Sequence, residues 1–382
     1  MSADAWDGAL GASFFAEAFA RKPFVARRGW PGDLRTVMTL TDLEHLLIAP
    51  PGAVASDARV EKVFGDGRVD AIRLPAEFSL AAVLERYRDG YSVVIDHVQY
   101  RWPPFSAMGA SLQQALARAA PERMRSGLSC SIFLTPPRAQ AQPRHDESAD
   151  VYTLQIEGTH RRRSPAPVGD APLLDVTLEP GDVLYVPRGF VHEAVGTDSH
   201  SLHVSFGVVP ITWHQIIGDI AAERPEWRRS VPKAFLDSDA AGGPLGETFS
   251  AMIARLADPA AVRKHFALAA MTYLLAERQT AAGELPEPAG EPAQPHRRTF
   301  EKRYGARHHV ERAGAELSVA FPGSVVRLPA SCAAVLEQIL HNDRVSAEDL
   351  ERAAGAEPAR EAIARLAGAG FLRAVEQPVA CT

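Results

Sequence analysis

Four stretches between residues 144 and 209 decide the fold: RHDE (144–147), DVYTLQIEG (150–158), PGDVLYVPRGFVH (180–192) and SLHVSFGVV (201–209). The last three contain short apolar runs of strand length. Strands are expected at 128–134, 151–156, 173–178, 183–186 and 202–209, with Gly and Pro between the runs. Short strands at close spacing, separated by turn residues, are typical of a β-sandwich or jelly roll. We therefore predict a strand-rich core that ends near residue 210.

His145, Glu147 and His192 form a candidate metal site. His145 and Glu147 lie two residues apart, so in an extended segment both side chains point to the same side and can hold one ion. His192 follows a Pro-Arg-Gly turn that can bring it back over the sheet. Two imidazoles and one carboxylate can hold Fe(II) and leave positions open for a co-substrate and oxygen. Asp146 is the competing carboxylate; being adjacent to His145 it should face the other way, so Glu147 is preferred.

The bulk composition excludes some classes of protein. A chain of 382 residues exceeds one usual core, so two or three domains are expected. The net charge of −6 argues against nucleic acid as the main partner. Three widely spaced cysteines offer no disulfide framework and fit a reducing cytoplasm. The sequence shows neither a signal peptide at its start nor an apolar run long enough for a membrane span, so we expect a cytoplasmic protein without membrane contact.

The composition also divides the chain. Residues 1–210 hold the predicted core, preceded by alternating helices and strands. Residues 211–280 show helical periodicity, and residues 281–295 are rich in Pro, Gly and Glu, as in a linker. Residues 296–382 indicate a strand, three helices and a second strand, with a wing-like segment at 368–375. The fold class is therefore α+β.

The stretch from Leu134 to His203 resembles the JmjC/cupin oxygenases of the ribosomal-oxygenase type (Cupin_4). The segment FARKPFV (19–25) is similar to the N-terminal entry of that family. The helical segment after Pro210 resembles its dimerisation domain, and the C-terminal segment resembles its winged-helix domain. The resemblance implies a double-stranded β-helix (jelly-roll/cupin) core with an N-terminal α/β elaboration, a helical dimerisation segment and a C-terminal winged-helix domain.

The resemblance also implies an activity. Family members are Fe(II)- and 2-oxoglutarate-dependent dioxygenases that use O2 to hydroxylate a carbon of a protein side chain, an Arg or His of a ribosomal protein. A biosynthetic peptide is an alternative substrate for a divergent member. The resemblance assigns the metal and the catalysis to His145, Glu147 and His192, and it implies a homodimer.

Two departures from the family pattern concern the site. The family usually has His-x-Asp, whereas this chain has His145-x-Glu147. The family commonly places a Lys or Arg fifteen residues after the first His, to bind 2-oxoglutarate; here that position is His160. Arg161 or Arg162 could serve after a small change of register. An imidazole is a weaker anchor than a guanidinium, because it is only partly charged at neutral pH.

Four further side chains are candidates for lining the co-substrate pocket, each equally plausible as an ordinary strand residue: Ser131, Thr153, His203 and Ser205. His203 could also hydrogen-bond a metal ligand. A second hypothesis is a non-catalytic, metal-binding cupin with a regulatory or interaction role. A third, a DNA-binding regulator, is disfavoured because the Arg residues of the C-terminal segment are diluted by Glu and Asp.

Overall fold

The computed structural model describes residues 5–48, 57–75, 78–120, 125–165, 173–231, 243–276, 299–302 and 308–375. The chain divides into two compact units, Met1–Pro210 and Ile211–Thr382. The predicted linker, 281–295, lies outside the described residues. Within the described part, none of the helices is long and apolar enough to cross a membrane.

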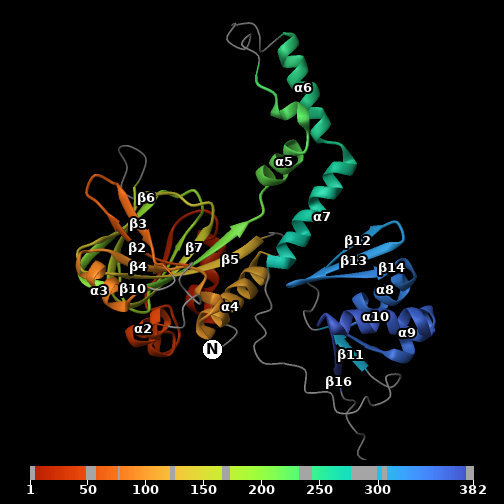
Figure 1. Ribbon diagram of the computed structural model, residues 1–382, viewed down its shortest axis with the longest axis horizontal. Helices are drawn as coiled ribbons and strands as arrows, with labels where there is room; N and C mark the ends of the chain where they lie inside the picture. Colours follow the sequence, from red (N-terminus) through yellow and green to blue (C-terminus); the bar gives the residue numbers. More distant parts are fainter. Residues whose placement is uncertain are drawn as a thin grey trace, which may run out of the picture. The chain divides into compact units, whose positions relative to one another are not determined.

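The first unit begins with helices and short strands and continues as the strand-rich core (Figure 1). Its helices are α1 (Ala5–Ser13), which runs into a π-helical turn (Phe14–Ala18), α2 (Leu40–Ile48), α3 (Leu80–Arg88) and α4 (Pro103–Ala119). Its strands are β1 (Phe24–Ala26), β2 (Ala58–Val63), β3 (Val69–Arg73), β4 (Ser92–Ile95), β5 (Arg125–Thr135), β6 (Gln140–His145), β7 (Asp150–Ser164), β8 (Leu174–Leu178), β9 (Val183–Val186) and β10 (His192–Pro210).

The core consists of two antiparallel sheets that share their long strands. One sheet has the order β9–β7–β10–β5, and the other has the order β6–β10–β7–β8. Strands β7 and β10 therefore pass from one sheet to the other. Gly158 lies at this bend with φ of +65°, and a Cβ there would lie 1.9 Å from the carbonyl oxygen of His200. Only glycine fits this position. The prediction of a jelly-roll core is confirmed.

The two faces of the first sheet differ in polarity. On β10, Leu202, Val204 and Phe206 are buried in the main apolar core. Helices α1 and α4 cover this face, and the indole Nε1 of Trp6 donates a hydrogen bond to the carbonyl of Met108 (2.9 Å). Each such buried side chain contributes about 1.5–3 kcal/mol. The alternate residues of β10 face the second sheet and are polar, which leaves the interior between the sheets for the site.

The N-terminal elaboration extends the first sheet. Strands β4, β2 and β3 continue it beyond β5, and β1 pairs with β9 at the other edge. Strands β2 and β3 form a hairpin around the turn at 65–67. The elaboration thus supports one wall of the interior.

The second unit begins with helices and ends in an α/β arrangement. The helices α5 (Trp213–Ala222), α6 (Pro244–Leu256) and α7 (Pro259–Ala276) come first. They are followed by β11 (Thr299–Lys302), β12 (His309–Ala313), β13 (Glu316–Phe321), β14 (Ser324–Pro329), α8 (Ala333–His341), β15 (Arg344–Ser346), α9 (Ala347–Ala354), α10 (Ala356–Gly368) and β16 (Leu372–Val375). Strands β15, β11 and β16 form one sheet.

The reading of the C-terminal segment as strand, three helices and strand was incomplete. It matches β11, α8, α9, α10 and β16 but misses the meander β12–β13–β14. Gly314 and Gly323 have positive φ in the two tight turns that join these strands. Alternate residues Leu317, Val319 and Phe321 are buried, which is the period of a half-buried strand.

Candidate functional site

The structure brings His145, Glu147 and His192 together. One ligand atom from each lies within 4.8 Å of the other two. His145 ends β6 and His192 begins β10, where the two are cross-strand partners. Their rings are 4.5 Å apart between centroids. Asp146 is exposed and lies outside this group. Within the described part of the chain, no second set of three His, Cys, Asp or Glu side chains has this spacing.

Backbone carbonyls fix the tautomer of both imidazoles. The Nδ1 atom of His145 lies 2.7 Å from the carbonyl oxygen of Pro143, and that of His192 lies 2.9 Å from the carbonyl oxygen of Phe190. A carbonyl can only accept, so each Nδ1 carries the proton when the ring is neutral. The Nε2 lone pairs are then free for a metal, and a ligand imidazole in proteins is usually held in this way. The donor set therefore fits a divalent ion.

The three groups differ in protonation. His145 Nε2 and Glu147 Oε1 are 3.0 Å apart, and this hydrogen bond raises the pKa of His145 and lowers that of Glu147. Burial lowers the pKa of His192 to about 4. At neutral pH His192 is therefore neutral, whereas the hydrogen bond to Glu147 favours the protonated form of His145. A metal ion must displace that proton.

The loop that precedes His192 is tied to the segment that carries Glu147. The backbone N–H of Gly189 donates to the carbonyl of Glu147 (2.8 Å). The carboxylate of Asp150 accepts from the Tyr185 hydroxyl (3.0 Å) and from the backbone N–H of Arg188 (3.2 Å). These hydrogen bonds hold the predicted turn in place and so fix the position of His192.

Arg162 is a buried cation that faces the same interior. Its Nε donates to His160 Nε2 (2.9 Å) and its Nη1 donates to Gln142 Oε1 (2.6 Å), while Nη2 lies 3.4 Å from His203 Nε2. Burial lowers the pKa of Arg162 to about 10, so it remains charged at neutral pH. All three partners are neutral acceptors. None of its hydrogen-bond partners is an acid, and Glu147 acts on it only through its charge. A buried charge with so little compensation is costly, so this position favours an anionic ligand.

Arg161 does not join this group. It lies on the opposite face of β7, where its guanidinium pairs with Asp175 of β8 at 2.5 and 2.6 Å. His160 is buried and hydrogen-bonded to other side chains of the interior. The alternation of β7 thus turns His160 and Arg162 inward and Arg161 outward. Of the two neighbouring arginines, the structure brings Arg162 into the interior.

The other predicted pocket residues also lie on the inner face. The hydroxyls of Thr153 and Ser205 are 2.9 Å apart across β7 and β10. Ser131 donates to Asp96 (2.7 Å). The ring of His203 is stacked on Phe133, with centroids 4.9 Å apart and planes 9° apart. The inner face is therefore lined by short polar groups.

The sequence reasoning missed three residues of the interior: Gln142, Gln155 and Ser201. Each is hydrogen-bonded to the group around Arg162. A signal was present in β7, where Gln155 interrupts an otherwise apolar run. A buried amide needs several partners, so a glutamine within a predicted core strand indicates a polar network.

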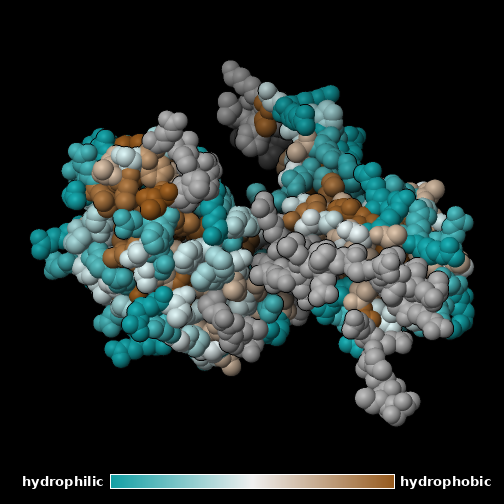
Figure 2. All heavy atoms as spheres, turned by 60° about the horizontal axis from the view of Figure 1, so that its bottom comes forward, coloured by the Kyte–Doolittle hydropathy of each residue, from teal (hydrophilic) through white to brown (hydrophobic). Residues whose placement is uncertain are grey.

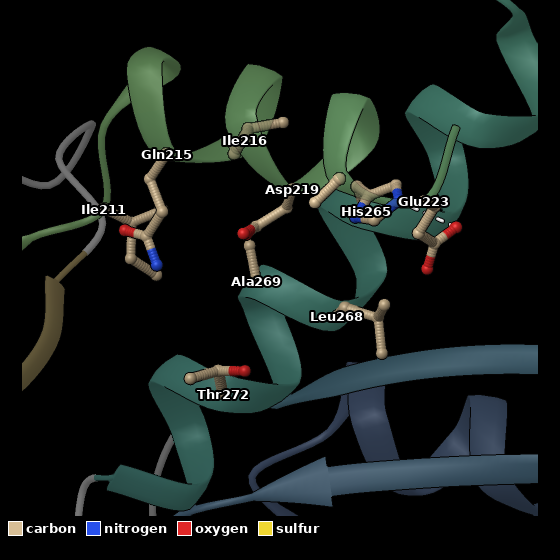
Figure 3. Close-up of a pocket in the computed structure, with 10 residues that line it drawn as sticks. Ile211, Gln215, Ile216, Asp219, Glu223, His265, Leu268, Ala269 and Thr272 are labelled. Atoms are coloured by element: carbon tan, nitrogen blue, oxygen red, sulfur yellow. Dashed lines mark ion pairs between the residues drawn. The ribbon is translucent and has the colours of Figure 1, made fainter. Parts of the chain in front are cut away.

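The second unit contains a separate hollow of about 280 Å³ between α5 and α7 (Figure 3). Gln215 and Asp219 of α5 face Leu268 and Thr272 of α7 across it. His265, which is buried, lies 3.3 Å from a carboxylate oxygen of Glu223. Its acidic groups and its histidine lack the spacing of a metal ligand set among the described residues. The first unit therefore holds the candidate metal site.

Residues 110–216 match the family model of the JmjC domain. This part of the chain is therefore similar to JmjC domains. The matched stretch contains the three candidate metal ligands and Arg162, and it begins within α4 and ends within α5. The JmjC match therefore covers the strands of both core sheets.

Named relatives agree with this assignment. A "bifunctional lysine-specific demethylase and histidyl-hydroxylase NO66" of Branchiostoma floridae is 28% identical over 234 residues, which are 59% of this chain and 36% of the relative. Human "ribosomal oxygenase 1" is 29% identical over 201 residues, 45% of this chain and 30% of the relative. The chain thus spans about a third of the length of these relatives.

A solved structure supports the fold. Escherichia coli YcfD, a ribosomal oxygenase determined in complex with cobalt and 2-oxoglutarate, matches with a TM-score of 0.51 and 19% identity. The match covers 95% of this chain and 98% of YcfD. At this identity the likeness concerns the fold, which extends over both units.

Proposed function

We propose that this protein is an Fe(II)- and 2-oxoglutarate-dependent oxygenase that hydroxylates a carbon atom of a protein or peptide side chain. The observation that carries the proposal is that a set of metal ligands and a buried cation face the same interior. His145, Glu147 and His192 offer ligands to a cation. Arg162, buried among neutral partners, offers N–H groups to an anion. A 2-oxo dicarboxylate has a chelating end and a distal carboxylate that would satisfy both.

The roles of the side chains follow from their chemistry. His145, Glu147 and His192 would hold Fe(II), which when bound supplies the oxidation of 2-oxoglutarate and of a substrate C–H bond by O2. Arg162 would bind the distal carboxylate through charge-assisted hydrogen bonds. The hydroxyls of Thr153 and Ser205 would line the same space, beside His203. The protein's part is to fix the ligands, leave positions open and aim the reaction at one carbon.

The relatives support the choice of substrate class. One carries "histidyl-hydroxylase" in its name, and others are named ribosomal oxygenases. We propose an Arg or His side chain of a ribosomal protein as the substrate, with a biosynthetic peptide as the alternative.

The substrate proposal is tested by incubating ribosomal proteins with the Fe(II)-loaded enzyme, 2-oxoglutarate and O2. Mass spectrometry should show the gain of one oxygen on a single residue. An unmodified protein set, with 2-oxoglutarate consumed, would contradict the ribosomal substrate and leave the biosynthetic peptide.

We also propose that α5, α6 and α7 mediate a homodimer. Their exposed faces carry large apolar residues, among them Trp213 (72% exposed), Phe249 (55%) and Ile253 (46%). Such residues favour burial against a second copy. Figure 2 shows hydrophobic areas interspersed with hydrophilic ones on the face that it presents. Light scattering tests the proposal: a dimer is expected, and a monomer at working concentration would contradict it.

The C-terminal segment is proposed to be a winged-helix-like module that serves in packing. The order α8–β15–α9–α10–β16 supports this topology, with β11 completing the small sheet. Arg344 and Arg373 both pair with Glu301. These arginines are thus engaged within the module, which argues against a phosphate-binding role.

A further inference from the structure

We propose that His160 and His203 are positioning residues, which hold the guanidinium of Arg162 in the orientation that receives the distal carboxylate of the co-substrate. This inference rests on the proposed function and deepens it. It gives a role to the histidine at the position where the family commonly has a Lys or Arg. The role is to orient a cation two residues further along the same strand.

The orientation of His160 is fixed from the backbone. The side-chain Nε2 of Gln155 donates to the carbonyls of Glu157 (2.8 Å) and Gly158 (3.1 Å). This sets the amide so that its Oε1 lies 2.6 Å from His160 Nδ1. Because the amide oxygen can only accept, His160 Nδ1 carries the proton. His160 Nε2 then has a free lone pair, which accepts the Nε–H of Arg162 at 2.9 Å.

His203 holds the guanidinium from a second side. Its ring is stacked between Phe133 and His160, with centroid distances of 4.9 and 4.4 Å. Its Nδ1 lies 3.2 Å from the hydroxyl of Ser201, and its Nε2 lies 3.4 Å from Nη2 of Arg162. The stack prevents the ring from turning, so the Nε2 atom stays directed at the guanidinium.

Neutral partners suit this task better than a carboxylate would. Burial lowers the pKa of both His160 and His203, so both rings accept hydrogen bonds without adding charge. A carboxylate in their place would neutralise Arg162 and compete with the co-substrate. A guanidinium has five N–H groups. Three of those of Arg162 point to partners in the described part of the chain, which leaves two for a carboxylate ligand.

The test measures binding of 2-oxoglutarate to the Fe(II)-loaded protein by calorimetry without oxygen. His160→Leu removes the hydrogen bonds of the ring to Gln155, Ser201 and Arg162, and we expect the affinity for 2-oxoglutarate to fall by about tenfold to a hundredfold. His160→Gln keeps an acceptor for Arg162 and a donor for Gln155, and should retain most of the affinity. Arg161→Ala, on the outer face of the same strand, is the matched control and should leave the affinity unchanged. Affinity for Fe(II) should be the same in all variants.

A double-mutant cycle separates positioning from a general structural role. In an Arg162→Leu background, His160→Leu should cause no further loss of affinity, because His160 acts through Arg162. If the two losses add, or if His160→Gln is as weak as His160→Leu, the positioning role is overturned. Should His160→Leu fail to fold, Gln155→Leu removes the group that fixes the tautomer and should give a similar loss. Unchanged affinity in Gln155→Leu would overturn the proposal.

The same experiment keeps the two proposals apart. If the wild-type protein with Fe(II) does not bind 2-oxoglutarate, the proposed function itself fails. If wild type binds it and Arg162→Leu does not, while His160→Leu binds as well as wild type, the function stands and the positioning role fails.

Discussion

The interior of the first unit contains two polar clusters that differ in exposure and in charge. His145 and Glu147 are partly exposed, and they pair with each other as an acid and a base. The Arg162 cluster is fully buried, and its single charge has neutral partners. The first cluster can bind a cation, and the second can bind an anion. Two clusters of opposite charge preference in one interior can together select a ligand by both of its ends.

Removal of His192 should have the largest effect, because it removes a donor from the first cluster. We expect His192→Ala to weaken Fe(II) binding by more than about a hundredfold, since even side chains that only orient a metal ligand contribute ten- to a hundredfold. Calorimetry with Fe(II) under anaerobic conditions measures this. His200→Ala is the control, as His200 pairs with Glu157 away from the trio. Equal metal affinity in His192→Ala and wild type would show that His145, Glu147 and His192 are not the metal site.

Removal of Arg162 should weaken binding at the second cluster alone. We expect Arg162→Leu to weaken 2-oxoglutarate binding by about a hundredfold, because each charge-assisted hydrogen bond contributes about 1.5–3 kcal/mol. Fe(II) affinity should not fall, since none of the metal donors is changed and the loss of the positive charge of Arg162 favours a cation at Glu147. Calorimetry with each ligand on the same preparation measures both. If the two affinities fall together, the clusters are not separable as described.

Protonation offers a way to sharpen the comparison. The hydrogen bond that His145 donates to Glu147 raises the pKa of His145, whereas burial lowers that of His192 to about 4. As the pH falls through the raised pKa of His145, Fe(II) must compete with one proton, and its apparent affinity should fall about tenfold per pH unit. His192 adds no second proton until the pH approaches 4. Calorimetry in buffers of different ionisation enthalpy counts the protons released. Release of two protons near neutral pH would contradict this assignment.

The smallest effects are expected just outside the two clusters. Asp146→Ala should leave Fe(II) affinity unchanged within about twofold, because an exposed group near a site contributes little. Its neighbour Glu147, tested as Glu147→Ala in the same titration, should lose metal binding. The reverse result would make Asp146 the carboxylate ligand.

The sequence predicted the proximity of His145, Glu147 and His192 better than it predicted the position of Arg162. The His-x-Glu spacing needs only an extended backbone to bring both side chains to one side, and that condition holds at the end of β6. The choice between Arg161 and Arg162 depends on the register of β7 after its bend at Gly158. Because side chains alternate along a strand, His160 and Arg162 must lie on the same face. The sequence does not show where the strand leaves one sheet for the other.

In the fold, too, the apolar parts of the strands were predicted and their polar extensions were not. Apolar runs predicted strands at 151–156 and 202–209, but β7 and β10 continue well beyond them, through polar residues such as Arg163 and Ser199. Those extensions form the second sheet, whose inner positions are filled by site residues rather than by apolar ones. Gln142 and Ser201, far apart in sequence, meet Arg162 or its partners only after both sheets have formed. Periodicity cannot reveal such a network.

The most direct test of the central claim is an anaerobic titration of Fe(II) and 2-oxoglutarate, followed by the weak visible metal-to-ligand charge-transfer band. The account predicts the band in wild type and in Arg161→Ala, its loss in His192→Ala, and its appearance in Arg162→Leu only at much higher 2-oxoglutarate. A wild-type protein that binds the metal but never gives the band would contradict the account, and the chain would then be a metal-binding cupin that does not use 2-oxoglutarate.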